Sequence, residues 1–201
     1  MTDRRRLTPV VAAAVLAVAV VAPVWATERA GTVSALTGRA TATADADERE
    51  LSARDPVHLR ELVSTAEDAR ATLGLGEHTV LHLGGAVEIL LERYVVDAGG
   101  TFELMGGAVV LEHDGPPMTE PLTIDSQYGR IVVRGTTVFA GPSRGVFGVF
   151  VQDGVAEVTA GGRTVVLEAG EGTNIESPGE APSEPQPWGT GRIEEALASV
   201  L

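Results

Sequence analysis

The sequence predicts an all-β fold: a single domain of many short antiparallel strands in a sandwich or stacked arrangement, with an N-terminal signal segment and a short C-terminal helix. Two observations support this prediction. Apolar and polar residues alternate in short runs between Arg29 and Glu176, and glycines separate most of these runs. Helical periodicity is scarce before the last residues of the chain. Runs of this length between turn residues are typical of sandwiches, barrels and stacked β folds.

The composition excludes several classes of function. The chain has no cysteine, so disulfides, thiolate metal sites and a cysteine nucleophile are excluded. Its net charge of −13 would repel a phosphate backbone, so we expect no nucleic-acid partner. The acidity favours solubility, or alternatively a basic partner.

Residues 1–26 have the three parts of a signal peptide. Arg4, Arg5 and Arg6 form a positive start, Val10–Ala22 is an unbroken apolar run, and small residues precede a cleavage site predicted after Ala26. An uncleaved membrane anchor is the alternative. Both interpretations place the rest of the chain outside the cytoplasm, in the periplasm or secreted, with membrane contact only through this segment if it is not cleaved. About nine residues precede the apolar run, so we expect no cytoplasmic domain there.

Several glycine-containing pairs predict turns between strands. Asp153-Gly154 lies between two apolar runs, and Asp-Gly favours the turns of β-hairpins. We therefore predict a hairpin at this position. A second hairpin is expected at Gly161-Gly162, and a turn at Gln127–Gly129.

The C-terminal region differs in composition from the β domain, which we place at residues 27–176. Residues 177–190 are rich in Pro, Glu and Ser and predict a flexible linker. Residues 191–201 predict a short amphipathic helix, because Ile193, Leu197 and Val200 fall on one helical face. A helix this short is marginal alone, so we expect it to dock on the domain or on a partner.

Few residues suggest a reactive or metal site. His78 and His82 would lie on one side of a strand, and Glu88 and His113 could complete a metal site. The alternative is that both histidines occupy the wetter face of an alternating strand. We favour this alternative and predict no metal ligands.

Catalytic and cofactor motifs are also missing. Asp125 and Ser126, near Arg130 and Arg134, form no recognisable triad with a histidine. No helix follows the glycines that would otherwise suggest a phosphate loop; these are Gly74, Gly76, Gly84 and Gly85. Gly135-Thr136 is interpreted as a tight backbone crossing and not as a nucleophile. We predict no catalytic residue, no cofactor and no enzymatic activity.

The order of strands and turns resembles the FecR domain family over Gly31–Ile175. The most specific stretches are Pro121–Ile124, Gly129–Thr136 and Val149–Val158. Similarity to this family implies an all-β periplasmic module, which in the best-known members senses a transporter and regulates a sigma factor. The shortness of the segment before the apolar run favours the stand-alone exported members, which lack a cytoplasmic anti-sigma segment.

The sequence therefore predicts a FecR-like module that binds a protein partner of the cell envelope and transmits a signal. The alternative is a structural or glycan-binding envelope protein. In either case we expect strand edges and loops to form the binding surface.

Overall fold

The computed structural model describes residues 28–201, apart from the side chain of Thr136. The signal segment predicted for residues 1–26 lies outside the described residues. The all-β prediction is confirmed: the described chain forms sixteen strands and one short helix, α1 (Thr190–Ala198). Across residues 28–201, no helix has the length and apolar character needed to cross a bilayer.

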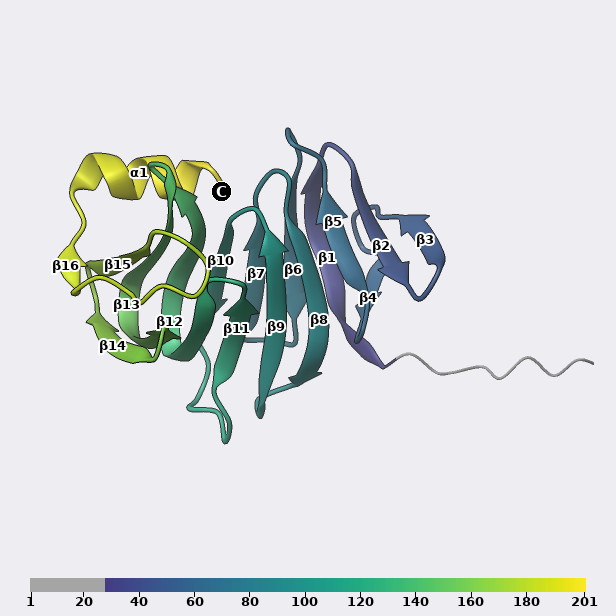
Figure 1. Ribbon diagram of the computed structural model, residues 1–201. Coiled ribbons are helices and arrows are strands. Elements are labelled where there is room, and N and C mark those ends of the chain that lie inside the picture. Colours follow the sequence, from purple (N-terminus) through teal and green to yellow (C-terminus); the bar gives the residue numbers. More distant parts are fainter. Residues whose placement is uncertain (1–27) are drawn as a thin grey trace, which may run out of the picture.

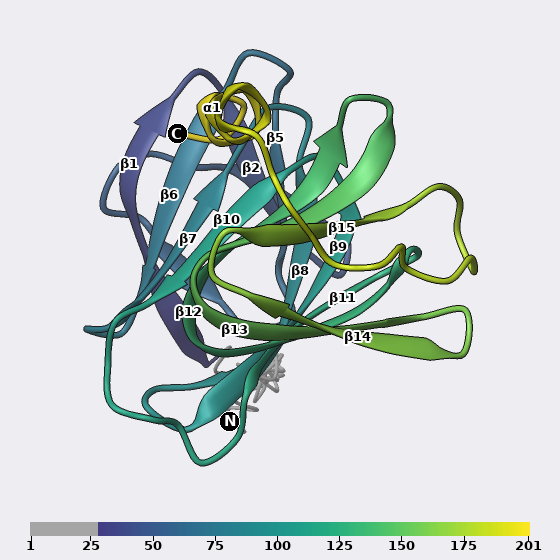
Figure 2. The same cartoon turned by 90° about the vertical axis from the view of Figure 1, so that its left-hand side faces the viewer.

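The strands form two layers that enclose a common hydrophobic core (Figures 1 and 2). The first layer has the order β3-β2-β5-β8-β9-β11. It continues through two long strands that it shares with the second layer and ends in β14. Its strands are β2 (Ala40–Ala44), β3 (Asp47–Glu50), β5 (Leu62–Thr65), β8 (Glu88–Val95), β9 (Gly99–Gly106), β11 (Leu122–Ser126) and β14 (Arg163–Glu168).

The second layer has the order β4-β1-β6-β7-β10 and ends in β15 and β16. Its strands are β1 (Arg29–Thr37), β4 (Pro56–His58), β6 (Arg70–Leu75), β7 (Thr79–Leu83), β10 (Val109–His113), β15 (Glu171–Ile175) and β16 (Gln186–Pro187). The chain crosses between the layers after every one or two strands.

Two long strands belong to both layers. β12 (Gly129–Ser143) and β13 (Val146–Ala160) have fifteen residues each and pair with one another along their length. β12 pairs first with β11 and then, beyond a bend, with β10. β13 pairs with β15 through its first half and with β14 through its second half. The β12–β13 hairpin therefore connects one edge of the first layer to one edge of the second layer.

The bend is made by glycine in both strands. Gly135 has a φ of 57° and Gly154 a φ of 81°, values that glycine adopts without the steric cost of a Cβ. The register shifts between Arg134 and Thr137 on β12 at this point. The hairpin predicted at Asp153-Gly154 is therefore wrong: Asp153-Gly154 lies inside β13 where its pairing with β12 is irregular, and the turn between β12 and β13 lies at Arg144-Gly145. The hairpin predicted at Gly161-Gly162 and the turn before Gly129 are present.

The corners where the chain crosses between layers are stacked on one another. Ala66 N–H donates to the Arg39 carbonyl at 2.9 Å, and Ala86 N–H donates to the Ala66 carbonyl at 3.0 Å. A Cβ on Gly107 would lie 2.6 Å from the Val87 Cα. Some of the glycines between strands thus allow close contact between successive corners.

A buried carboxylate ties together the strands at the start of the two layers. Glu61 is only 5% exposed. Its oxygens accept two bonds from Arg49 Nη2 on β3, at 2.8 and 3.0 Å, and one from the His58 backbone N–H at 2.9 Å. Burial acts to raise the pKa of the Glu61 carboxyl, but the hydrogen bonds from His58 and Arg49 outweigh it and hold the pKa below its ordinary value.

We expect Glu61→Gln to lower the free energy of unfolding by about 1.5–3 kcal/mol at pH 7, because charge-assisted hydrogen bonds are lost. A carboxyl whose pKa is lower in the folded state stabilises above its unfolded pKa of about 4.3, and this contribution disappears as the pH falls through the folded value. The difference between wild type and variant should therefore shrink below about pH 4. Urea unfolding at several pH values measures it.

Glu50→Gln is the matched control. Glu50 is 68% exposed and lies 3.9 Å from Arg39, so its loss should change stability by less than about 0.5 kcal/mol. Equal effects of the two substitutions, or a difference independent of pH, would contradict the role given to Glu61.

Candidate functional site

The outer face of the second layer is covered by the C-terminal segment. Trp188 stacks on Phe150 with ring centroids 5.2 Å apart and meets Phe139 edge-on at 6.2 Å. A Cβ on Gly148 would lie 2.8 Å from the Trp188 ring. Only glycine at that position lets the indole lie flat on the sheet.

Helix α1 continues this cover with its apolar side. Ala196 and Val200 are buried, and Ile193 and Leu197 pack against Ala108, Val110 and the aromatic rings of the same cluster. The predicted short C-terminal helix is thus present, and it docks on its own domain. In this arrangement its apolar face is not available to a partner.

Two arginines attach the helix to the hairpin β12–β13 and its neighbours. The Arg192 guanidinium lies 3.6 Å from the Trp188 ring centroid and donates to Ser143 Oγ at 3.0 Å and Asn174 Oδ1 at 2.8 Å. Arg144 forms a two-pronged ion pair with Glu195, at 2.9 and 3.1 Å. The hydrogen bond from Arg144 holds the pKa of the Glu195 carboxyl below its ordinary value.

The segment predicted as a linker, residues 177–190, lies against the sheet. Thr173 Oγ1 donates to the Ser183 carbonyl at 2.8 Å, and Ser183 N–H donates to the Asn174 carbonyl at 2.9 Å. β16 pairs with β15 further along. These bonds hold the segment between β15 and Trp188 against the sheet.

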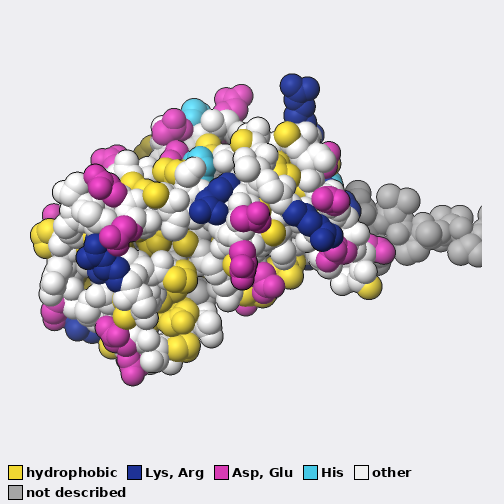
Figure 3. All heavy atoms as spheres, turned by 90° about the horizontal axis from the view of Figure 1, so that it is seen from above, with side chains coloured by type: hydrophobic (Ala, Val, Ile, Leu, Met, Phe, Trp, Pro, Cys, Tyr) yellow, Lys and Arg dark blue, Asp and Glu magenta, His cyan; other side chains and the backbone are white. Residues whose placement is uncertain are grey.

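The outer face of the first layer carries polar and charged side chains at the surface. Cross-strand neighbours include Asp125 with Arg130, joined by bonds of 2.7 and 2.9 Å, and Thr159 with Thr164. The top of the molecule, a different side, likewise has acidic side chains scattered among arginines and hydrophobic atoms in small groups (Figure 3). Near its edge, the outer face of the first layer exposes Val155 and Val166, at 39% and 52%.

The strand edges of the two layers differ in how they are protected. β3 carries charged side chains at all four positions, Asp47–Glu50, and β4 has three residues and begins with Pro56. Charge, proline and shortness discourage pairing with another chain. β14 has six residues and, in the described part of the chain, pairs only with β13. Among residues 28–201 it is therefore the longest strand edge open to a partner.

The four residues considered as metal ligands do not converge. His78 and His82 flank the inward-facing Thr79 and Leu81 of β7 and lie on its wetter side, as the preferred interpretation predicts. His113 is buried and bonds to Thr79 Oγ1 at 3.1 Å. Glu88 lies on β8 in the other layer. Within residues 28–201, no three His, Asp or Glu side chains are close enough to share a metal ion.

The residues considered for a catalytic triad, a phosphate loop or a backbone crossing lie at a turn, a corner and a bend. Ser126 Oγ accepts from Tyr128 N–H at 3.2 Å and donates to the Gly129 carbonyl at 3.1 Å, which stabilises the β11–β12 turn. Gly85 approaches the Glu67 carbonyl at a corner between layers. At Gly135, no atom beyond the chain neighbours lies within 4 Å of where a Cβ would be, so this residue forms an open bend and not the close crossing expected there.

Comparison with known proteins gives one family model and three similar solved chains. The family model described as FecR protein matches residues 61–157. Two crystal structures, each described as "a putative anti-sigma factor" from Parabacteroides distasonis, align with 68% of this chain. Their TM-scores are 0.53 and 0.54 at 16% and 15% identity, and the chain covers 64% and 63% of them, less than two thirds of their length. Likeness at this identity shows the fold alone. No curated protein matches the chain.

We expect Trp188→Ala to lower the free energy of unfolding by about 3–5 kcal/mol, because it removes a buried aromatic side chain and leaves a cavity between α1 and the sheet. Equilibrium unfolding in urea measures the change. Leu201→Ala, at a side chain that is 62% exposed, should change stability by no more than about 0.5 kcal/mol.

A loss below about 1 kcal/mol for Trp188→Ala would mean that the C-terminal segment contributes little to the domain. That result would contradict its assignment as a fixed cover of the second layer.

Proposed function

We propose that this chain, which carries a FecR domain, is an extracytoplasmic binding and signalling module that acts through protein–protein contacts and not through catalysis. The family match over residues 61–157 confirms the resemblance inferred from the sequence. The structures with a similar fold are each described as "a putative anti-sigma factor", which supports a regulatory role. The apolar run Val10–Ala22 after three arginines supports export.

The free edge of β14 is the observation that carries the proposal. One layer of the molecule is closed on its outer side by Trp188 and α1, whereas the other ends in a six-residue strand that pairs on one side only among the described residues. An extended segment of a partner can add to such an edge through main-chain hydrogen bonds. Val166 on β14 and Val155 on β13 give this edge exposed apolar side chains.

The charges near this edge indicate the chemistry of the partner segment. Glu157 lies opposite Val166 and Glu168 lies opposite Val155 in the β13–β14 register. The chain as a whole has a net charge of −13. A partner strand with apolar residues at its centre and basic residues at its ends would complement this surface.

Val166→Lys tests the edge directly. A charged side chain on an edge strand discourages strand addition, so we expect binding of the protein partner to weaken at least ~10-fold. Val96→Lys is the matched control, because Val96 is also 52% exposed but lies in the β8–β9 turn. Both variants should keep the melting temperature of the wild type.

The measurement begins with affinity capture from envelope extracts and continues with the purified partner in a titration. We expect one stoichiometric protein, retained by wild type and Val96→Lys and lost with Val166→Lys. Retention on cell-wall glycan in place of a protein would favour a structural envelope role. Equal capture by all three proteins would contradict the role proposed for the β14 edge.

A further inference from the structure

We propose that a cavity at the bend of β12 is a binding site for a small amphipathic carboxylate, with the apolar body inside the cavity and the carboxylate at Arg134. The cavity has a volume of about 480 Å³, within the range of small-molecule sites in proteins. The proposal goes beyond the protein contacts described above and does not depend on them.

The path of the backbone accounts for the cavity. β12 leaves the first layer at Arg134 and joins the second at Thr137, so the strands on either side diverge at this point. The loop from residue 114 to residue 121 crosses between the layers and closes over the gap. Gly135 in its wall has no atom within 4 Å of a Cβ position, so no core side chain fills the space beside it.

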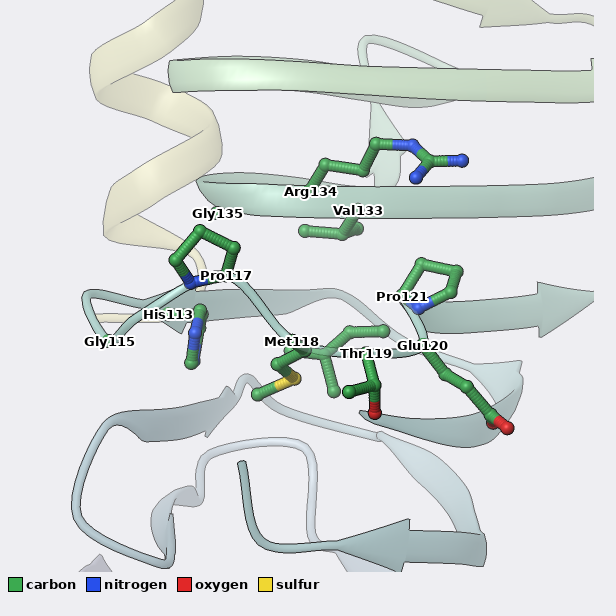
Figure 4. Close-up of a pocket in the computed structure, with 11 residues that line it drawn as sticks. His113, Gly115, Pro117, Met118, Thr119, Glu120, Pro121, Val133, Arg134 and Gly135 are labelled. Atoms are coloured by element: carbon green, nitrogen blue, oxygen red, sulfur yellow. The ribbon is translucent and has the colours of Figure 1, made fainter. Parts of the chain in front are cut away.

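Apolar side chains form about half of the cavity walls. Figure 4 shows Pro117, Met118, Pro121 and Val133 around the space, and Leu122 completes the set. Met118 is half-buried and packs on the main hydrophobic core. A ligand entering past the loop would therefore bury an apolar body against proline rings, a thioether and branched side chains.

Among the described residues, the polar groups of the cavity differ in their hydrogen bonds: His113 and Glu120 have partners, whereas Arg134 has only a longer ion pair. Both ring nitrogens of His113 already have partners, Thr79 Oγ1 and the Pro116 carbonyl, each at 3.1 Å. The Glu120 carboxylate accepts from Arg93 at 2.7 Å and extends away from Arg134 in Figure 4.

Arg134 forms the rim from the opposite side. It is 61% exposed, and its Nε lies 3.6 Å from Glu157 Oε1, longer than a charge-assisted hydrogen bond. A ligand carboxylate can therefore approach the guanidinium with the paired geometry that arginine offers to carboxylates. A phosphate or sulfate without an apolar body would leave the apolar walls unused.

The test uses full-length protein labelled with 13C at the methionine methyl groups and titrated with octanoate. The chain has three methionines; Met118 lines the cavity and Met105 is 43% exposed on β9. We expect a saturable shift of the Met118 methyl signal with a Kd of about 1 mM or below, and no shift of Met105. 1-Octanol and octylamine should bind at least ~10-fold more weakly, because they lack the charge that pairs with Arg134.

Arg134→Gln should weaken octanoate binding about 10-fold, equivalent to about 1.4 kcal/mol. Arg39→Gln is the control, since Arg39 is 66% exposed and lies far from the cavity at the β1–β2 corner. Three results would each overturn the proposal: no shift of Met118, parallel shifts of Met118 and Met105, or equal affinity of octanoate for wild type and Arg134→Gln.

Discussion

The pairing of β12 with β13 is the interaction on which the other features of the structure depend. Each strand begins in one layer and ends in the other, so the two layers share a hairpin of two fifteen-residue strands. Without disulfides in the chain, strand pairing and burial alone hold the layers together. The bend at Gly135 and Gly154 allows this sharing, because both residues take positive φ angles that would strain most others.

The same hairpin makes the two outer faces unequal. Its second-layer half presents Phe139 and Phe150 outward, and these rings receive Trp188 and helix α1. Its first-layer half carries polar side chains and leads to β14, whose outer edge has no strand partner among residues 28–201. The divergence of strands at the bend also leaves the cavity beside Arg134. The closed face, the open edge and the cavity therefore have one structural origin.

The sequence predicted the strands well where one face of each strand is buried. In β6 the alternation of apolar and polar residues matches the alternation of burial, whereas in β7 the polar Thr79 is buried and the apolar Val80 is not. The C-terminal helix follows from its apolar spacing. The Asp153-Gly154 hairpin was wrong because a glycine with positive φ also fits an irregular position inside a long strand, and local sequence does not distinguish this from a turn. The docking of α1 had a signal that alternation alone misses: Phe147–Val151 is buried at every position, which requires cover on both sides. The cavity had no signal in the strand pattern, because a loop and the bend of β12 form it together.

Native-state hydrogen exchange tests the central claim that the shared hairpin makes the two layers one cooperative unit. The amides of β8 in the first layer and β7 in the second should report the same free energy of opening. Gly135→Ala adds backbone strain at a φ of 57°, and apart from the chain neighbours no atom lies within 4 Å of its Cβ. It should lower both values together by about 1–3 kcal/mol. If one layer kept its protection while the other lost it, the layers would be independent and the account would be contradicted.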